Sequence, residues 1–280
     1  LARPILVGRP EVLLARIERF GLRLRLGQDV EVTNPEYDER FPQYWTTYWE
    51  LRCRDGISKE MARVEMRRRL TLIGAMMVRL GDADGMICGT VGEYHNHLRF
   101  VDEVIGRKPD ASTYAAMNIL LLNQRTVALV DTHVNDNPDA EQIAEFTIAA
   151  ARQMEWLNLT PKVALLSRSN FGSGSAASGA KMRNALEIIR AQAPDIQADG
   201  EMHGDCALDE SLRLRLLPMS PLKGAANLLV CPNVDAGNIA YNLLKTEAGS
   251  NVAVGPFLLG VNAPVNILTS SATVRRIRSE

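Results

Sequence analysis

A Ser/Gly-rich segment offers the strongest local chemistry in this sequence. It reads Ser-Arg-Ser-Asn-Phe-Gly-Ser-Gly-Ser over residues 167–175, after the apolar run Val163–Leu166 and before the helical pattern Lys181–Ala191. Backbone amides and hydroxyls in such a loop converge on an anion at the helix start, and Arg168 would add a forked cationic donor. The glycines fit neither the dinucleotide fingerprint nor a P-loop. The pattern therefore predicts either a phosphate-cradling loop or a merely flexible one.

The sequence contains few residues whose spacing would suit a metal site. Asp82 and Asp84 stand two residues apart, but the residues that follow them are apolar and supply no further oxygen ligands. We therefore expect a tight turn leading into a short strand at 85–89. The four histidines also lack the spacing of a metal site and are interpreted as polar loop residues: His95, His97, His133 and His203.

Three strand–loop–helix units position the Ser/Gly-rich segment. Strands are predicted at Val127–Val130, Val163–Leu166 and Asn227–Val230, followed by helices that start at Asn137-Pro138, at Lys181 and at Ile239. This alternation is typical of a mostly parallel sheet with helices on its faces. Such sheets gather ligand-facing groups at the carboxyl ends of their strands, where Asp131 would lie.

The first hundred residues have a different texture. An Arg-rich helix is predicted over Lys59–Leu80, with a solvated basic face above a packed apolar stripe that includes Met61, Val64 and Leu70. The aromatic residues of segment 44–49 are interpreted as packing or interface residues rather than as a base-stacking platform. The chain opens on Leu1 and leads at once into a predicted buried strand at 4–8, so we expect a fragment of a longer polypeptide.

Composition excludes several classes of protein. The 280 residues are 46% hydrophobic and 23% charged, which is typical of a globular protein of two packed lobes. Thirty-two basic against 33 acidic residues give a formal charge of −1, without the broad basic footprint of a nucleic-acid or lipid-binding protein. No apolar run approaches the ~20 residues that cross a bilayer, and no signal peptide opens the chain. We expect a cytoplasmic protein whose cysteines are small buried hydrophobes: Cys53, Cys88, Cys206 and Cys231.

Beyond these physical inferences, the sequence resembles phosphate acetyltransferases over almost its whole length. The motifs that carry the resemblance occur in that family's order: Gly-Asp-Ala-Asp-Gly at 81–85, Leu-Ser-Arg-Ser at 166–169 with Gly172-Ser173, Asp-Gly-Glu at 199–201, Cys-Pro-Asn at 231–233 with 235–241, and Gly255-Pro256 with Gly260 and Pro264. The exact residues of segments 167–173, 201–205 and 44–49 narrow this resemblance. They are similar to the acetyltransferase-like C-terminal half of bacterial NADP-dependent malic enzymes.

The sequence departs from the family where that family does its chemistry. Phosphate acetyltransferases carry Leu-Ser-Arg-Gly-Cys-Ser followed by Asp-Ile, whereas this chain has Leu-Thr-Ser-Ser-Ala-Thr-Val-Arg-Arg-Ile at 268–277. Thr269 keeps a hydroxyl at the serine position. Ser270 replaces the arginine that would hold phosphate, and a serine offers no planar charged fork. Arg276 replaces the aspartate proposed to help deprotonate the CoA thiol, and a fixed cation cannot accept a proton.

The resemblance implies a two-lobed α/β fold like that of phosphate acetyltransferase and isocitrate dehydrogenase, a three-layer sandwich with mostly parallel sheets and a cleft between the lobes. We expect the first lobe at 1–115 with 263–280, lacking the family's first strand and helix, and the second at 116–262. No catalytic residue is expected. The family's pattern gives these candidate acetyl-CoA or phosphate contacts: Arg99, Asp131, Thr132, Asn135, Ser167, Arg168, Ser169, Ser173, Asn233, Asn238, Thr269 and Ser270.

In function, the resemblance implies a catalytically disabled regulatory domain that senses acetyl-CoA as an allosteric inhibitor. The N-terminal malic half of the same polypeptide would convert malate to pyruvate and CO2 with NADP and Mg²⁺ or Mn²⁺, and no cofactor or metal is expected in this chain. A homo-oligomer is expected, with the aromatic stretch Tyr44–Trp49 as a contact or as part of its own lobe's core. Two alternatives stay open, an active phosphate acetyltransferase that uses Thr269 and a relocated base, and an oligomerisation module with a vestigial cleft.

Overall fold

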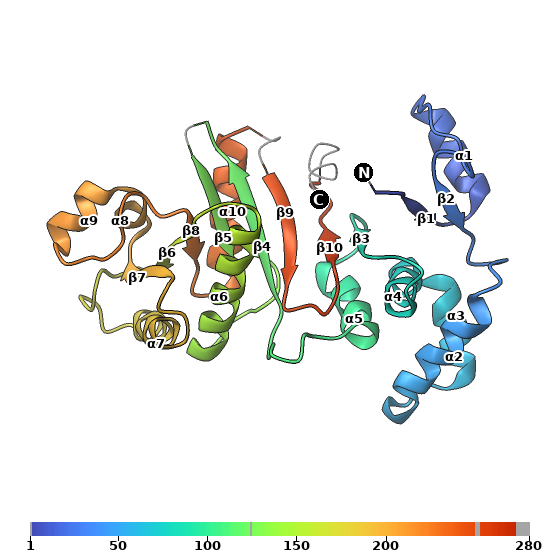
Figure 1. Ribbon diagram of the computed structural model, residues 1–280, viewed down its shortest axis with the longest axis horizontal. Coiled ribbons are helices and arrows are strands. Elements are labelled where there is room, and N and C mark those ends of the chain that lie inside the picture. The colour runs from blue at the N-terminus through green and yellow to red at the C-terminus, as the bar shows by residue number, and fades with distance from the viewer. Residues whose placement is uncertain (1, 124, 250–252, 273–280) are drawn as a thin grey trace. The chain divides into compact units, whose positions relative to one another are not determined.

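The computed structural model describes residues 2–123, 125–249 and 253–272 (Figure 1). This part of the chain divides into two compact units, one comprising the residues up to Gly106 with Ala263–Val265, the other Arg107–Asn262 with the described residues from Asn266 onward. None of the described helices is long and apolar enough to cross a membrane.

The boundary between the units differs from the one predicted from the sequence. Residues 107–115 and 266–272 were expected in the first lobe, but the structure groups them with the second unit. Arg107 forms an isolated β-bridge with Val261, and the amide of Lys108 donates to the carbonyl of Gly260. Asn266 pairs with Phe257 in an antiparallel ladder. Backbone hydrogen bonds to the last strands of the sheet thus decide where these segments belong.

The first unit is mainly helical. Its elements are β1 (Ile5–Val7), α1 (Pro10–Arg19), β2 (Glu31–Thr33), α2 (Phe41–Arg52), the 3-10 turn η1 (Cys53–Asp55), α3 (Lys59–Arg68), α4 (Leu70–Leu80), β3 (Met86–Gly89) and α5 (Tyr94–Val104). Strands β1 and β2 pair in parallel, and β1 is half-buried rather than buried as predicted. The turn predicted around Asp82 and Asp84 is confirmed, and β3 follows it.

The predicted helix over Lys59–Leu80 is two helices. Arg69 separates α3 from α4 with an extended backbone, φ −110° and ψ 94°. Helix α4 is buried on several sides, whereas α3 buries only Ala62 and Met66. The predicted stripe is therefore wrong at its N-terminal end, where Met61, Val64 and Leu70 are exposed. A break in the helix resets the 3.6-residue period, and no glycine or proline marks it in the sequence.

The second unit is built on a mixed sheet. Its strands are β4 (Ala115–Leu121), β5 (Thr126–Val130), β6 (Lys162–Leu166), β7 (Gln197–Met202), β8 (Leu228–Val230), β9 (Ala253–Leu259) and β10 (Val265–Leu268). Hydrogen-bonded neighbours follow the order β10-β9-β4-β5-β8-β6-β7. The sheet is parallel from β5 through β8 and β6 to β7, and antiparallel from β5 through β4 and β9 to β10.

Helices cover both faces of this sheet (Figure 1). They are α6 (Ala140–Trp156), α7 (Ala177–Gln192), α8 (Gly204–Leu208), α9 (Glu210–Leu216) and α10 (Val234–Glu247). Because side chains alternate along a strand, Ala128 and Val130 pack with residues of α6 and α7, while Val127 and Leu129 pack with Tyr241 of α10 and with residues of α8. The α/β class and the layered arrangement expected for this lobe are confirmed.

The helices of the strand–loop–helix units begin earlier or later than predicted. Helix α6 starts at Ala140 because Asp139 caps it and exchanges hydrogen bonds with Gln142 in a capping box, so the Asn137-Pro138 signal misplaced the start. Helix α7 starts at Ala177 rather than Lys181, and α10 starts at Val234 with Asn233 as its cap rather than at Ile239.

The N-terminal turn of α10 packs directly against the end of β5. A Cβ atom added at Gly237 would lie 2.0 Å from the backbone oxygen of Asp131, far inside van der Waals contact. Only a residue without a side chain lets the helix approach this closely. Gly237 therefore joins the loop after β5 to the helix after β8.

We predict that Gly237→Ala destabilises the protein by about 2 kcal/mol or more, because the methyl group forces α10 away from the strand. Urea unfolding monitored by circular dichroism measures the loss. Gly204→Ala is the matched control, since nothing lies within 4 Å of the added Cβ atom, and its effect should stay within about 0.5 kcal/mol. Equal stability of the two variants would contradict this account of the helix approach.

Candidate functional site

The loops that follow β5, β6, β7 and β8 lie at one edge of the sheet, because these four strands are parallel. Two side chains tie the loops together. The ammonium of Lys181 donates to Oδ1 of Asn137 and to the carbonyl of Pro232, both at 2.8 Å. The amide of Asn238 donates to the carbonyl of Thr132 at 3.1 Å. The edge is thus one connected polar surface built from loops distant in sequence.

Asp131 organises the loop after β5. Its buried carboxylate accepts the backbone N–H groups of Ala116, His133, Val134 and Asn135, and also the side-chain amide of Asn135. Burial raises the pKa of Asp131, while these donors oppose that rise. Both oxygens are engaged by the protein itself, so this carboxylate acts as a structural anchor.

Thr132 and Asn135 are engaged in the same way. The Thr132 hydroxyl accepts from the amide of Asn118 and donates to the carbonyl of Ala116. The Asn135 amide donates to the carbonyl of Tyr114, and its oxygen accepts from the hydroxyl of Thr113. The structure brings the candidate residues Asp131, Thr132 and Asn135 together, but their polar atoms form hydrogen bonds within the protein that hold the loop in place.

A buried carboxylate that sequence reasoning missed supports the Ser/Gly-rich loop. Glu201, fully buried at the end of β7, accepts through Oε1 from the Ser169 hydroxyl at 2.8 Å, the Gly172 amide at 3.1 Å and the Arg183 guanidinium at 2.9 Å. Burial raises the pKa of Glu201, but the three donors outweigh it and hold the pKa below 4.5. Spacing gives no hint of this cluster, because its members come from three different segments.

Two glycines allow the loop to fold onto itself. A Cβ atom at Gly174 would lie 2.8 Å from Cβ of Ser169, and one at Gly179 would lie 2.9 Å from the Ser169 hydroxyl oxygen. Phe171 and Gly172 have positive φ angles of 50° and 84°, which reverse the chain between the serines. Ser169 is consequently part of the packed interior of the loop.

The free hydrogen-bond donors of this loop lie at the start of α7. Helix α7 begins after Ala176 without a side-chain cap, so its first-turn amides have no capping acceptor. The Ser167 hydroxyl oxygen would lie 3.5 Å from a Cβ atom at Gly179, in that first turn. Arg168 is exposed and makes no side-chain hydrogen bond or ion pair with a described residue. Amide, hydroxyl and guanidinium donors of this kind can hold a phosphate or carboxylate.

Ser173 and Asn233 occupy supporting positions. The exposed Ser173 accepts through its hydroxyl from the amide of Asn170 at 3.1 Å. The Asn233 side chain caps α10 by accepting from the amide of Ala236 at 2.9 Å. Both residues shape the turns at the edge of the sheet.

The residues at the family's reactive loop connect to the same edge through α10. The hydroxyls of Thr269 and Ser271 lie 3.2 Å apart, and the Lys245 ammonium lies 3.3 Å from Ser271. Lys245 also donates to Asn242, whose amide donates to Asn238. Ser270 is exposed. Arg276 lies outside the described residues.

Arg99 belongs to the first unit. It lies on α5 with Nε 3.8 Å from Glu103, and its guanidinium sits 4.5 Å from the centre of the Phe100 ring. These contacts leave more than half of the side chain exposed.

The described residues offer little support for a reactive cysteine or for a metal site. Burial, together with the charge of Asp131, raises the pKa of Cys231 to about 12, and burial raises the pKa of Cys206. The prediction of four buried cysteines is wrong at Cys53, which is exposed, and Cys88 is half-buried. Within the described residues, no three His, Cys, Asp or Glu side chains cluster as a metal site would require.

The mixed sheet, its covering helices and the polar loops at the sheet edge define an α/β protein with a candidate anion-binding site. The chain belongs to the phosphate acetyl/butaryl transferase family, whose model matches residues 1–279. Two solved structures share its fold: EutD phosphotransacetylase from Staphylococcus aureus (TM-score 0.83, 26% identity, 99% of this chain and 83% of that chain) and a phosphotransacetylase from Streptococcus pyogenes (TM-score 0.82, 28% identity, 98% and 91%).

Curated relatives are of two kinds. The chain is 50% identical over 277 residues to the NADP-dependent malic enzyme of Escherichia coli (strain K12), covering 99% of this chain and 36% of the relative. It is 45% identical over 276 residues to the NAD-dependent malic enzyme of Rhizobium meliloti (99% and 36%), and 35% identical over 273 residues to the phosphate acetyltransferase of Nitratidesulfovibrio vulgaris (98% and 38%). The chain spans little more than a third of the length of these relatives.

We predict that Glu201→Gln destabilises the protein by about 2–3 kcal/mol at pH 7, because an amide cannot accept from the guanidinium as a carboxylate does. The lowered pKa of Glu201 means that its ionised form stabilises the fold above pH 4.5, and that this contribution is lost as pH falls through the folded-state pKa.

Urea unfolding from pH 7 down to pH 3.5 tests this linkage. The difference between wild type and Glu201→Gln should shrink as the pH falls, whereas Glu187→Gln, an exposed change on α7, should cost little at any pH. A difference that stays constant across this range would show that the charge of Glu201 is not what stabilises the loop.

Proposed function

We propose that this chain is the C-terminal, phosphotransacetylase-like regulatory domain of a longer malic enzyme polypeptide, and that it senses acetyl-CoA as an allosteric inhibitor. One observation carries the proposal. The loop after β6 presents Arg168 and the uncapped start of α7 on a scaffold whose family arginine is replaced by Ser270. Anion-binding groups are retained where the reactive group is lost. The similarity to malic enzymes over 99% of the chain supports the larger context.

The surroundings of Thr269 support the loss of catalysis. Its hydroxyl lies 3.2 Å from the hydroxyl of Ser271, and the nearest charged group in that network is the ammonium of Lys245. No described carboxylate or imidazole hydrogen-bonds to Thr269 as a general base would. The active-enzyme alternative therefore lacks its relocated base among these residues.

The candidate contacts divide into two sets in the proposed effector site. Arg168, Ser167 and the first-turn amides of α7 would meet the phosphates of acetyl-CoA. Arg168 has no side-chain partner among the described residues, and α7 has no side-chain cap. The Ser167 hydroxyl has only a long contact, 3.4 Å, with the Ser169 hydroxyl among the described residues. Asp131, Glu201 and their partners would hold the loops in place. Binding of this kind does not need the family's catalytic groups, because remote contacts supply affinity separately from chemistry. Arg99, which the family's pattern adds to the candidate contacts, stays a prediction of the sequence.

The rest of the polypeptide would perform the malic enzyme reaction. In that part, NADP would accept the hydride from malate, and Mg²⁺ or Mn²⁺ would assist the loss of CO2. Relatives named as NADP-dependent and as NAD-dependent both match this chain, so the regulatory domain is compatible with either nucleotide in its neighbour. Inhibition then requires reciprocal coupling, in which a ligand at the malate site changes acetyl-CoA affinity by the same factor.

We predict that this chain transfers acetyl groups from acetyl phosphate to CoA at least about 1,000-fold more slowly than a typical enzyme at ~10 per second. The losses at positions 270 and 276 remove a charge clamp and a proton acceptor. A coupled thiol assay measures the rate, with a phosphate acetyltransferase as the positive control. Turnover within about tenfold of that typical value would instead establish the active-enzyme alternative.

We predict that Arg168→Gln weakens acetyl-CoA binding by about 10-fold or more, because one charge-assisted hydrogen bond to phosphate is lost. Isothermal titration calorimetry on the chain measures the affinity. Arg215→Gln removes an equally exposed arginine from α9 and is the matched control. If both variants bind like the wild type, the effector site lies elsewhere; if the wild type binds nothing, the oligomerisation-module alternative gains support.

Self-association is also proposed, and for the aromatic stretch Tyr44–Trp49 the sequence left both an interface and a core position open. Tyr44 and Tyr48 of the aromatic stretch are 1% and 2% exposed and belong to the core of their own unit. Helix α10, in contrast, exposes Ile239 and Leu243 one turn apart, at 59% and 63%. We predict at least a dimer by light scattering at micromolar concentration, and a smaller species for Leu243→Asp. A monomeric wild type would contradict this proposal.

A further inference from the structure

Helices α2 and α3 carry a row of three cations, each placed on an aromatic ring. The Arg67 guanidinium lies 4.9 Å from the centre of the Phe41 ring, Arg63 lies 4.2 Å from Trp45, and the Lys59 ammonium lies 4.5 Å from Trp49. Both partners repeat at steps of four residues, and the sequence numbers run in opposite directions, so the two helices are antiparallel. We call this surface the cation–aromatic row.

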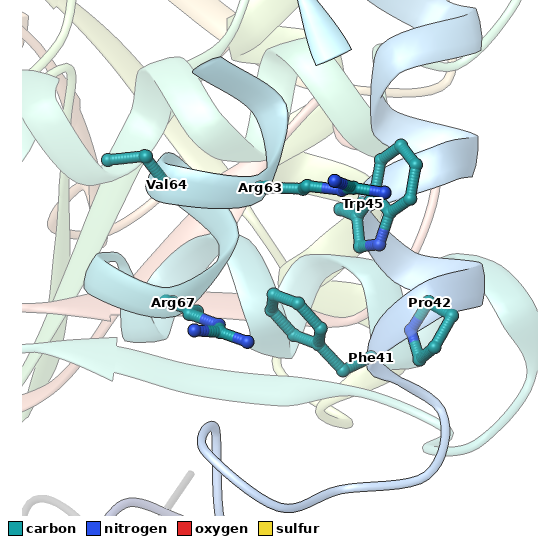
Figure 2. A pocket seen from close by; sticks show the side chains of 6 residues that line it. All are labelled: Phe41, Pro42, Trp45, Arg63, Val64 and Arg67. Atoms are coloured by element: carbon teal, nitrogen blue, oxygen red, sulfur yellow. The ribbon is translucent and has the colours of Figure 1, made fainter. Parts of the chain in front are cut away.

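The row borders a groove of about 480 Å³. Its lining is Phe41, Pro42, Trp45, Arg63, Val64 and Arg67, and Figure 2 shows the two guanidinium groups extending from α3 toward the rings of α2. Met61 and Val64 add exposed apolar surface, at 50% and 46%. Trp, Arg and Met are residue types enriched at protein interfaces.

The charge of the row is not neutralised by ion pairs. No described carboxylate forms a salt bridge with Lys59, Arg63 or Arg67, whereas the neighbouring Arg69 pairs with Glu65 at 3.2 Å. The nearby Glu60 forms no salt bridge with the row. Its pKa is lowered first by backbone and Ser58 hydrogen bonds at the start of α3, and to a lesser extent by the charges of Arg63 and Lys59. Stacking on rings holds the cations in place without occupying their N–H donors.

The spacing of the row indicates the form of an anionic partner. Steps of four residues at ~1.5 Å per residue place the cations about 6 Å apart, over about 12 Å in total. Carboxylates at positions i, i+4 and i+8 of an α-helix have the same spacing, and that helix could bury its apolar side chains against Pro42 and Val64, which line the groove. A single small anion would engage only part of the row. The cations cover ring faces on which nucleic-acid bases would stack.

We propose that the cation–aromatic row docks an acidic α-helix supplied by the part of the longer polypeptide outside this chain. A second copy of the chain is a poor occupant, because no described helix presents three acidic residues at i, i+4 and i+8. The source of the helix rests on the proposed function, in which this chain is one domain of a malic enzyme. The chemistry of the surface does not.

A peptide titration on this chain tests the surface. The sequence has three tryptophans, and Trp156→Phe removes the one that is 75% exposed in the second unit, leaving Trp45 and Trp49 as fluorescent reporters. A helical peptide with Glu at i, i+4 and i+8 should bind and change their emission, with affinity that falls as salt rises. The same peptide with Gln in place of Glu should bind at least about 10-fold more weakly.

Variants on α3 supply the controls. Arg63→Gln with Arg67→Gln should weaken the Glu peptide by at least about 10-fold, while Arg68→Gln, an exposed arginine of the same helix without a ring partner, should leave it unchanged. Circular dichroism and melting temperature verify that all variants fold alike. Equal binding of the two peptides, no binding, or tighter binding of inorganic tripolyphosphate than of the Glu peptide would overturn the proposal.

Cross-linking in the full-length polypeptide tests the source of the helix. A carbodiimide joins an amine to a carboxylate at zero length, so Lys59 should link to an Asp or Glu outside these 280 residues. Mixing isotopically light and heavy protein should yield only unmixed products if the helix belongs to the same polypeptide. Mixed products, or no link beyond α3, would overturn the source. Peptide binding by a parent without malic enzyme activity would refute the proposed function and leave the docking surface standing.

Discussion

The second unit depends on how the chain leaves β5. The carboxylate of Asp131 accepts from four backbone amides and one side-chain amide, and the backbone oxygen of the same residue forms the surface against which Gly237 packs. β5 is also where the sheet changes from parallel to antiparallel pairing, since its neighbours are β8 and β4. One residue thus joins the antiparallel half, through Ala116, to the parallel half, through α10. A buried carboxylate with all its acceptors engaged rigidifies a loop that would otherwise need ordering by a ligand.

Glu201 plays the corresponding role for the loop after β6. Its contacts to Gly172 and Arg183 enclose Ser169, a serine that the sequence pattern assigned to ligand binding. Arg168 and the start of α7 remain as donors without a side-chain partner among the described residues. The anchoring groups of the two loops are therefore buried carboxylates, whereas the donors left at the loop surface are an exposed guanidinium and the amides at the start of a helix. This separation follows from desolvation, because a buried charge must be satisfied inside the protein and an exposed one remains available.

Three strands of the second unit, β5, β6 and β8, could be predicted from the sequence, because each is a short apolar run followed by a loop and a helix of ordinary period. The strands β4, β7, β9 and β10 were missed. The helix starts at Ala140 and Ala177 could not, because a capping box and an uncapped alanine start are decided by local geometry. The break at Arg69 carries no glycine or proline signal. The Glu201 cluster was missed because its three donors converge only in the folded chain. The order of the motifs along the chain predicted the family, because motif order carries information that the periodicity of hydrophobic residues lacks.

The same buried anchors make the geometry of the sheet edge independent of the loop at 269–271. Asp131, Glu201 and Gly237 hold the sheet edge through contacts that do not involve Thr269 or Ser270. Ser270 is exposed, so the fold does not rely on a charged side chain at this position. Replacement of Glu201 would strand buried donors and unfold the loop. The geometry of the sheet edge is thus set by buried anchors, so that substitutions at exposed positions such as 270 can change the chemistry of the edge while the fold stays in place.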